Sequence, residues 1–300
     1  MASIHSYNFA GKRALIRVDF NVPLNKETLE VTDDTRIRAA APTIKHILDQ
    51  GGSVVLMSHL GRPKNGYEQK FSMENIVDHV SKVIGTPVKF AGDCIGEGAY
   101  EMSKNLSQGE VMILDNVRFY AEETAGDEAF AEKLAKHGDV YVNDAFGTAH
   151  RAHASTTIAA KFFPNDKLFG FLIEGEIESV DKVLNSTEKP VTAIVGGAKV
   201  SSKIVIIERL LDRVDNLIIG GGMAYTFVKA NGGQIGNSLV EDDFIDMAKS
   251  IMEQASAKGV NLVIPTDTII ADNFANDANT QEVQIDAIPD GWMGLDVGAQ

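Results

Sequence analysis

The chain has 300 residues, 44% of them apolar and 23% charged, with a formal net charge of −14. This length exceeds what one hydrophobic core usually organises, so we expect two lobes. An acidic surface argues against a nucleic-acid partner, which would need a broad basic face. We expect neither an export signal nor a membrane span, and the only cysteine, Cys94, cannot form an internal disulfide. These features predict a cytoplasmic protein without nucleic-acid or membrane partners.

Strand-like runs alternate with helix-like segments along the chain, as is typical of a parallel sheet with crossover helices. In the first lobe the pattern predicts strands at 14–19, 53–58, 87–90, 111–114 and 140–142. Capping residues predict three helices between them. These helices begin at Asp33 or Asp34, at Ser72 and at Asp127, and they end at the glycines near 51, 85 and 138.

A break at 162–166 (FFPND) precedes an amphipathic helix at about 172–184, and Lys189-Pro190 ends the connection. We therefore predict an N-terminal domain at 1–168, a hinge helix and linker at 169–188, and a C-terminal domain at 189–300. The second lobe repeats the alternation, with strands at 191–195, 216–219, 261–264 and 292–296. Its helices are expected at about 201–213, 223–231 and 242–258.

The predicted fold class is α/β, with two doubly wound parallel-sheet (Rossmann-like) lobes. The chain stops at Gln300, directly after the predicted strand 292–296. A parallel strand normally leads into a crossover helix and is covered on both faces. We therefore expect the second lobe to be incomplete.

Lone basic residues follow the predicted strands of the first lobe. They are Arg36, His59, Arg62, Arg118, His150 and Arg151. Ligands of parallel α/β sheets bind beyond the carboxyl ends of the strands, so these cations should meet at one edge. The repulsion between two such cations 4 Å apart would cost roughly 4 kcal/mol at an effective dielectric of 20. The simplest resolution is a small, multiply charged anion, such as a phosphate ester that carries a carboxylate.

A metal site is the alternative use of His150 and His153, which are three residues apart. Transition-metal sites usually have three or four protein ligands, and Arg151 between the two histidines would repel a cation. Anion binding is therefore the preferred interpretation. Asp19 ends an apolar strand, where a carboxylate needs a partner, so we expect it to face the ligand.

Two glycine-rich turns follow strands of the second lobe. One is Gly196-Gly197-Ala198-Lys199, with Lys203 four residues after Lys199, and the other is 220–223 (GGGM). Glycines permit close approach to a ligand, and lysines at i and i+4 on one helix face can hold phosphates. Neither turn fits the P-loop or the Gly-x-Gly-x-x-Gly pattern, which disfavours a nicotinamide enzyme.

Six stretches, in compatible order and spacing across the whole chain, resemble the phosphoglycerate kinase family. They are 17–23 (RVDFNVP), 58–63 (SHLGRP), 116–119 (NVRF), 143–153 (NDAFGTAHRAH), 196–200 (GGAKV) and 220–224 (GGGMA). The resemblance implies a monomer that binds 3-phosphoglycerate on the N-terminal lobe and Mg²⁺ with ATP or ADP on the C-terminal lobe. Closure of the lobes would then permit phosphoryl transfer to give 1,3-bisphosphoglycerate.

The resemblance also implies residue roles. Asp19 and Asn21 would hold the hydroxy-acid end of the substrate, and Arg36 would reach the transferring phosphoryl group. The substrate phosphate would contact His59, Arg62, Arg118 and Arg151, with His150 nearby. Phe20, Leu60 and Gly61 are carried over as substrate-binding residues. The adenine and ribose pocket would be lined by Gly197, Ala198, Gly221, Gly222, Leu239, Gly294 and Leu295. Lys199 and Lys203 would contact the nucleotide phosphates and, with Arg36, serve as catalytic residues.

Family members continue for roughly another quarter of their length. The continuation carries a ribose-binding glutamate and the aspartate that anchors Mg²⁺, so the expected metal ligand lies beyond residue 300. Ala299 stands where the family usually has proline. The expectation is a fragment or truncated form. Its alternative function is that of an anion-binding module without turnover.

Overall fold

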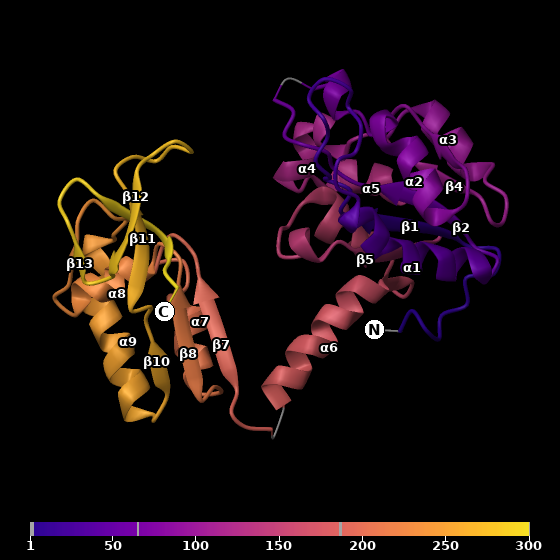
Figure 1. Ribbon diagram of the computed structural model, residues 1–300. Coiled ribbons are helices and arrows are strands. Elements are labelled where there is room, and N and C mark those ends of the chain that lie inside the picture. Colours follow the sequence, from indigo (N-terminus) through magenta and orange to yellow (C-terminus); the bar gives the residue numbers. More distant parts are fainter. Residues whose placement is uncertain (1–2, 65, 186–187, 300) are drawn as a thin grey trace. The chain divides into compact units, whose positions relative to one another are not determined.

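The structure is a computed structural model that describes residues 3–64, 66–185 and 188–299 (Figure 1). It divides into two compact units, Met1–Asp181 (unit 1) and Lys182–Gln300 (unit 2). This division falls inside the predicted hinge segment 169–188. Ser186 and Thr187, within that segment, lie outside the described residues. Gln300, after which the chain was expected to be truncated, also lies outside them.

Unit 1 is built on six parallel strands in the order β3-β4-β2-β1-β5-β6. The strands are β1 (Arg13–Val18), β2 (Ser53–Met57), β3 (Val88–Phe90), β4 (Val111–Ile113), β5 (Val140–Asp144) and β6 (Lys167–Phe169). The first five correspond to predicted strands. The edge strand β6 was missed because it directly follows the break at 162–166, which was interpreted as the end of the strand and helix alternation of the first lobe.

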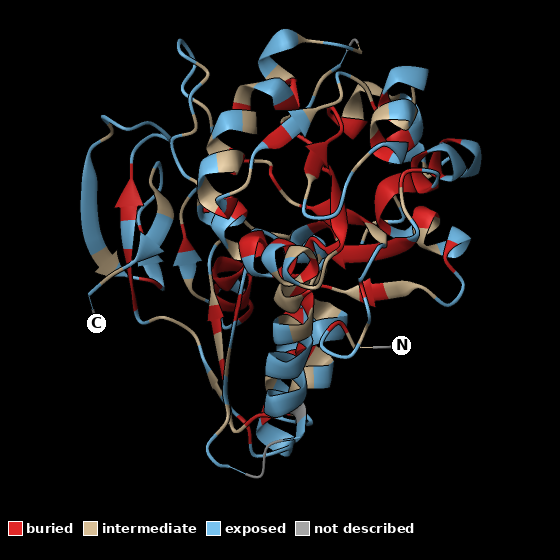
Figure 2. Ribbon diagram, turned by 90° about the vertical axis from the view of Figure 1, so that its right-hand side faces the viewer, coloured by how far each residue is buried: buried red, intermediate tan, exposed pale blue. Residues whose placement is uncertain are grey.

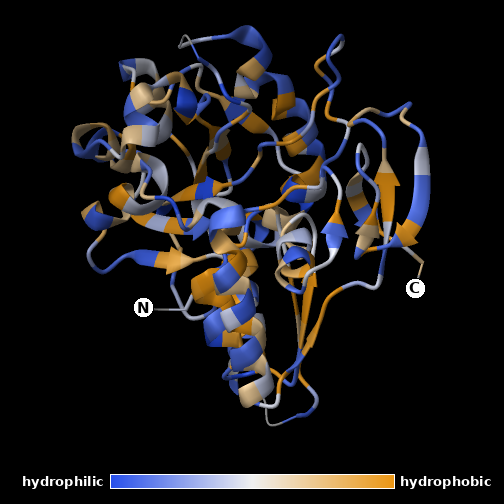
Figure 3. Ribbon diagram, turned by 90° about the vertical axis from the view of Figure 1, so that its left-hand side faces the viewer, coloured by the Kyte–Doolittle hydropathy of each residue, from blue (hydrophilic) through white to orange (hydrophobic). Residues whose placement is uncertain are grey.

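Both faces of this sheet are buried, as expected for parallel strands. Along β1, Ala14, Ile16 and Val18 belong to one hydrophobic cluster, whereas Leu15 belongs to another on the opposite face. Figure 2 shows the strands of the sheet as the buried part of the unit, and Figure 3 shows hydrophobic residues along them. The sheet is therefore a rigid platform whose strand ends can position side chains.

The helices of unit 1 cover this sheet. They are α1 (Thr35–Asp49), α2 (Val77–Ile84), α3 (Glu97–Lys104), α4 (Ala121–Ala125) and α5 (Glu128–Ala135). A further helix, α6 (Phe171–Asn185), begins in unit 1, leads away from the sheet and continues past the division at Asp181 (Figure 1). Two predicted caps are confirmed, since Ser72 Oγ accepts a hydrogen bond from Glu74 N and Asp127 Oδ1 accepts one from Phe130 N. Before α1, Asp33 accepts from Thr35 N, whereas Asp34 binds Arg38. The helices α3 and α4 were not predicted from the sequence.

Unit 2 contains a three-stranded parallel sheet in the order β10-β8-β7. Its strands are β7 (Thr192–Gly196), β8 (Asn216–Gly220) and β10 (Asn261–Val263), and its helices are α7 (Ile204–Leu210), α8 (Ala224–Ala230) and α9 (Ile245–Ala257). Both sheets and their crossover helices agree with the predicted α/β class. No helix in the described part of either unit combines the length and apolarity that a membrane crossing needs.

One prediction for unit 2 was wrong. The segment expected as a further parallel strand at 292–296 is β14 (Met293–Val297), which pairs antiparallel with β11 (Asp267–Ala271) in a separate sheet with β12 (Thr280–Gln284). The chain reverses between β11 and β12, where Asp272 Oδ2 accepts a hydrogen bond from Asn279 Nδ2 at 2.7 Å. An antiparallel strand needs no crossover helix, so the argument for incompleteness drawn from this strand does not hold. A short parallel pair joins β9 (Gln234–Ile235) and β13 (Ala287–Ile288).

His137 is a fully buried histidine at the end of the α5 segment. Its Nε2 lies 2.8 Å from Cys94 O and its Nδ1 lies 3.0 Å from Ser103 Oγ. Burial lowers its pKa to about 4, although the hydrogen bond to the Cys94 carbonyl acts in the opposite direction. The neutral ring is therefore a part of the core that acid should disrupt.

We predict that His137→Gln reduces the loss of stability on acidification. The pKa of the folded state lies below that of the unfolded chain, so this contribution is complete above about pH 6.5 and is lost as the pH falls toward 4. Between pH 7 and pH 5 the wild type should lose about 2 kcal/mol more than the variant. Urea denaturation followed by circular dichroism at both pH values measures this difference, and equal losses in the two proteins would contradict it.

Candidate functional site

The carboxyl ends of four neighbouring strands in unit 1 carry most of the predicted anion-binding residues. Asp19 and Asn21 follow β1, His59 follows β2, Arg118 lies in the 3₁₀ turn Val117–Phe119 after β4, and Arg151 follows β5. These strands are adjacent in the order β4-β2-β1-β5. Their loops are therefore neighbours in space, as the sequence analysis expected.

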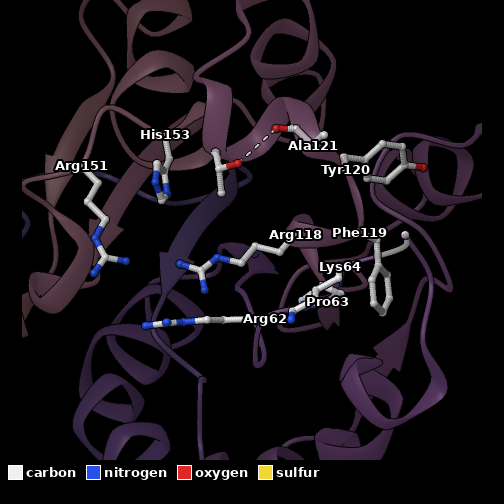
Figure 4. A pocket seen from close by; sticks show the side chains of 11 residues that line it. Arg62, Pro63, Lys64, Arg118, Phe119, Tyr120, Ala121, Arg151 and His153 are labelled. Carbon is white, nitrogen blue, oxygen red and sulfur yellow. Dashed lines mark hydrogen bonds between the residues drawn. The ribbon is translucent and has the colours of Figure 1, made fainter.

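A pocket of about 610 Å³ opens among these loops. Its lining is Arg62, Pro63, Lys64, Gly66, Arg118, Phe119, Tyr120, Ala121, Thr124, Arg151 and His153. Figure 4 shows the guanidinium groups of Arg62, Arg118 and Arg151 reaching into one space, with the His153 ring beside them. Three forked cations in a single cavity suit a ligand with several anionic oxygens.

Arg118 is held in place by its own backbone and by the neighbouring loop. Asn116 Oδ1 accepts a hydrogen bond from Arg118 N at 3.0 Å, and Arg118 Nη1 donates to Gly61 O at 3.1 Å. The buried Nε–H has no partner among the described residues. Burial, followed by the positive charges of Arg17 and Arg151, lowers the pKa of this guanidinium. A bound oxyanion would supply both the missing acceptor and the compensating charge.

Asp19 connects Arg36 on α1 to the loop that follows β1, and Asn21 connects that loop to the one that follows β2. Its Oδ2 accepts a hydrogen bond from Arg36 Nη1 at 2.9 Å, and its Oδ1 accepts a weaker one from Asn21 N at 3.3 Å. Asn21 Oδ1 in turn accepts from Gly61 N at 2.7 Å. Gly61 has φ +61°, and a Cβ there would come within 2.4 Å of the Phe71 ring, so the turn requires glycine. Arg36, Asp19 and Asn21 are thus brought together beside the pocket.

Arg17, which was not predicted as a site residue, is 1% exposed and lies at the centre of this arrangement. Its Nη2 donates to His59 Nδ1 at 3.2 Å, its Nε donates to Ser155 Oγ at 2.8 Å, and Nη1 donates to Val18 O. The available signal was a charged residue inside the apolar run of β1. Such a residue is expected to have buried partners.

His59 is a neutral residue in this environment. Burial lowers its pKa to about 2, and the charges of Arg17, Arg118, Arg36 and Arg151 act in the same direction. Its Nδ1 lies 3.8 Å from Asp19 Oδ1, which is too long for a hydrogen bond. The contact is therefore not an ion pair at neutral pH.

The remaining predicted residues of unit 1 occupy different positions. The side chains of Phe20 and Leu60 are buried in the hydrophobic core, so only their backbone atoms can serve a ligand. His150 is exposed and is absent from the pocket lining, whereas His153 lines it. In the described part of the chain, no group of three or more His, Cys, Asp or Glu side chains is placed to hold a metal ion.

The two glycine-rich turns of unit 2 pack against each other. Met223 N donates to Gly197 O at 2.8 Å, and a Cβ on Gly221 would come within 2.9 Å of Gly197 N. A Cβ on Gly222 would meet Leu239 Cδ2 at 2.9 Å and Ala198 Cα at 3.5 Å. Five of the predicted nucleotide-binding residues are therefore in one place, and substitution of either glycine would force the turns apart.

The two lysines do not share a helix face, which corrects the argument based on i and i+4 spacing. The helix predicted from residue 201 is α7, which begins only at Ile204, so Lys199 lies in the preceding turn. The cause is a contact with a residue 40 positions away, because Ser201 donates from both N and Oγ to Glu241 at 3.0 and 2.7 Å and is held outside the helix. Lys203 still approaches the first turn, since a Cβ on Gly197 would lie 3.7 Å from its Cε.

Gly294 and Leu295, on β14, lie close to the same turns. Gly294 N donates to Ser238 Oγ at 2.9 Å, and a Cβ at this position would overlap the Tyr225 ring. Leu295 and Gly221 line one small pocket of about 40 Å³. Neighbouring backbone and apolar side chains of this kind can form one wall of a site for a planar ring.

Comparisons with known proteins agree on one family. Residues 4–300 match the profile of the family described as "Phosphoglycerate kinase". The chain is 51% identical to a phosphoglycerate kinase of Porphyromonas gingivalis, covering 99% of this chain and 76% of that protein. It is 53% identical to "Phosphoglycerate kinase 3, cytosolic" of Arabidopsis thaliana, with 99% and 74% covered, and 52% identical to a chloroplastic relative from Volvox carteri, with 96% and 62% covered.

Solved structures give the same result. The phosphoglycerate kinase of Coxiella burnetii matches with a TM-score of 0.80 at 38% identity, covering 99% of this chain and 74% of that one. The enzyme of Pyrococcus horikoshii matches with a TM-score of 0.82 at 28% identity, covering 100% and 76%. The chain thus spans between 62% and 76% of the length of these relatives.

We predict that Arg118→Ala weakens the binding of inorganic phosphate to this chain by about tenfold, because a charged hydrogen-bond donor is lost from the pocket. The effect should be larger at low salt, where screening is weaker. Arg38→Ala is the matched control, because Arg38 is an exposed arginine of the same unit that binds Asp34. Calorimetric titration of the three proteins measures the effect, and equal affinities would remove Arg118 from the anion site.

Proposed function

This chain belongs to the phosphoglycerate kinase family, and on that premise we propose that it binds 3-phosphoglycerate on unit 1 and transfers a phosphoryl group reversibly between its carboxylate and ATP. The observation that carries the proposal is the pocket in which Arg62, Arg118 and Arg151 meet, with Arg118 Nε still unpaired. That pocket suits the phosphate of the substrate.

The opposite end of the substrate would lie toward Asp19, Asn21 and Arg36. Asp19 can accept a hydrogen bond from the substrate hydroxyl, and Arg36, which is half exposed, can reach the carboxylate and the incoming phosphoryl group. The reacting carboxylate is ionised at neutral pH, so the reaction needs no general base. Catalysis then consists of positioning the reactants and neutralising charge on the phosphoryl oxygens.

The glycine-rich turns of unit 2 are the proposed nucleotide site. Gly197, Gly221 and Gly222 allow the base and ribose to approach the backbone, and Lys199 and Lys203 are exposed or half-exposed point charges for the phosphates. We include Mg²⁺ as part of the ATP or ADP complex and derive no step from it. Bending at the linker 169–188, a monomeric state and a cytoplasmic location complete the proposal.

The proposal is tested by assaying this 300-residue chain with millimolar ATP and 3-phosphoglycerate. A coupling dehydrogenase reduces the acyl phosphate product with NADH, so that turnover is followed as the oxidation of NADH. We expect NADH oxidation that requires both substrates. Calorimetric binding of 3-phosphoglycerate without turnover would support the alternative of an anion-binding module, which the comparisons do not favour. Absence of both binding and turnover would overturn the proposal for this chain.

Lys203→Ala should lower turnover on the order of 10²–10³-fold, the usual effect of removing a group that stabilises transition-state charge. Affinity for 3-phosphoglycerate should not change, because that ligand is assigned to unit 1. Lys258→Ala is the matched control, since Lys258 binds Asp212 away from the glycine-rich turns. Steady-state kinetics on this chain, or on one extended to the length of its relatives, provides the measurement. An unaltered kcat would show that the role of Lys203 is wrongly assigned.

A further inference from the structure

Glu123 is a fully buried acidic residue beneath the anion pocket. It lies on α4, whose residues Ala121 and Thr124 line that pocket (Figure 4). Both of its oxygens accept hydrogen bonds from Ser155, Oε1 from the hydroxyl at 2.6 Å and Oε2 from the backbone N–H at 2.9 Å. The role described above for the pocket does not use this residue.

Local backbone geometry brings α4 and Ser155 together. Ser155 lies in the π-turn Ala154–Ile158, and the Tyr141 hydroxyl approaches Ser155 O and Thr156 O at 2.9 and 2.6 Å. Gly126, just after α4, has φ +69°, and a Cβ there would come within 2.4 Å of Ala152 O. Turns with i to i+5 bonds are rare and occur frequently at functional sites. The close approach therefore requires both the glycine and the unusual turn.

A chain of hydrogen bonds runs from Glu123 through Ser155 and Arg17 to His59, and the donor and acceptor of each bond are fixed. Arginine cannot accept a hydrogen bond, so Arg17 Nε must donate to Ser155 Oγ, and the hydroxyl proton must then point to Glu123. For the same reason Arg17 Nη2 donates to His59 Nδ1, which must be unprotonated. The single proton of the neutral ring is consequently on Nε2. No described residue accepts a hydrogen bond from that atom.

The alternative tautomer of His59, with the proton on Nδ1, would have Asp19 as its hydrogen-bond acceptor. Asp19 Oδ1 lies 3.8 Å from the same Nδ1, close enough to attract a proton there if Arg17 moved away. The ring would then present the lone pair of Nε2 to the ligand, and a lone pair repels an oxyanion. The position of Arg17 therefore decides whether His59 acts as a donor or an acceptor.

We propose that Glu123 is a positioning residue for the anion site: through Ser155 it holds the Arg17 guanidinium against His59 Nδ1, and this keeps the His59 proton on Nε2, where a bound oxyanion can accept it. The inference rests on the proposed function only in naming 3-phosphoglycerate as that anion.

Electrostatics alone gives the opposite expectation. Removing the Glu123 charge leaves the surrounding arginines less compensated, so a purely coulombic role would make Glu123→Gln bind anions more tightly. The positioning role requires weaker binding, because the guanidinium is released and the His59 donor is lost. The sign of the change therefore separates the two explanations.

The test uses the 300-residue chain labelled with ¹⁵N-histidine, as wild type, Glu123→Gln, Ser155→Ala and Glu122→Gln. Glu122 is an exposed neighbour on α4, so its variant is matched in charge and location. Long-range ¹H–¹⁵N spectra without ligand report the His59 tautomer, with the signal assigned by its loss in His59→Gln. Calorimetry with 3-phosphoglycerate gives the affinity.

We expect the proton on Nε2 in the wild type and in Glu122→Gln, and a shift toward Nδ1 in Glu123→Gln and Ser155→Ala. Both of the latter variants should bind 3-phosphoglycerate about tenfold more weakly, the usual effect of losing a hydrogen bond to a charged group. A wild-type proton on Nδ1, an unchanged tautomer in the variants, or tighter binding by Glu123→Gln would overturn the proposal.

If Glu123→Gln does not fold, Ser155→Ala decides, because it cuts the same connection while keeping both charges. A folded Ser155→Ala protein with the wild-type tautomer refutes the inference. The tautomer is read without ligand, so its result stands whether or not the wild type binds 3-phosphoglycerate. Failure of that binding refutes the proposed function instead.

Discussion

The burial of the Arg17 guanidinium at the carboxyl edge of the unit 1 sheet is the constraint on which the anion site depends. Removing a cation from water costs several kcal/mol unless its donors and its charge are satisfied. Ser155, His59 and the Val18 carbonyl satisfy the donors, and Glu123 and Asp19 raise the pKa of Arg17 against the effect of burial. The carboxylates of Glu123 and Asp19 thus offset the positive charge of Arg17, which lies beside the pocket.

Within the described residues, the pocket arginines Arg62, Arg118 and Arg151 form no ion pair with a carboxylate. Arg118 keeps a buried Nε–H without an acceptor among the described residues, and Arg17 and Arg151 both lower its pKa. The parallel sheet enforces this crowding, because adjacent strands lie about 4.8 Å apart and their loops must end side by side. Amide side chains join these loops, with Asn116 Nδ2 donating to Leu60 O and Phe71 O at 2.6 and 3.0 Å. A rigid frame with uncompensated charge is a preorganised anion site, because the energetic cost of assembling it is met on folding.

Periodicity and capping chemistry were enough to predict five of the six strands of unit 1, two helix caps and the edge at which the arginines meet. They failed where a long-range contact decides the local structure. Glu241 holds Ser201 outside α7, and pairing with β11 makes β14 an antiparallel strand. Arg17 and Glu123 were missed for a related reason. A charged residue in an apolar strand, such as Arg17, signals a buried partner, whereas nothing in the sequence separates Glu123 from the exposed Glu122 beside it. In neither case does the sequence say which residue, 138 or 32 positions away, will supply the contact.

Under the proposed function the two units would hold phosphate groups by different physical means, and the difference fits the proposed reaction. Unit 1 would use planar guanidinium groups, of which that of Arg118 is fixed by a hydrogen bond, and this suits a phosphate that stays bound while chemistry occurs at the other end of the substrate. Unit 2 combines glycine backbone with lysines, whose charge lies at the end of a flexible chain. The transferred phosphoryl group spreads its charge over three oxygens and changes position during the reaction. A mobile point charge such as that of Lys203 can follow this movement, whereas a fixed fork would stabilise only one end of the path.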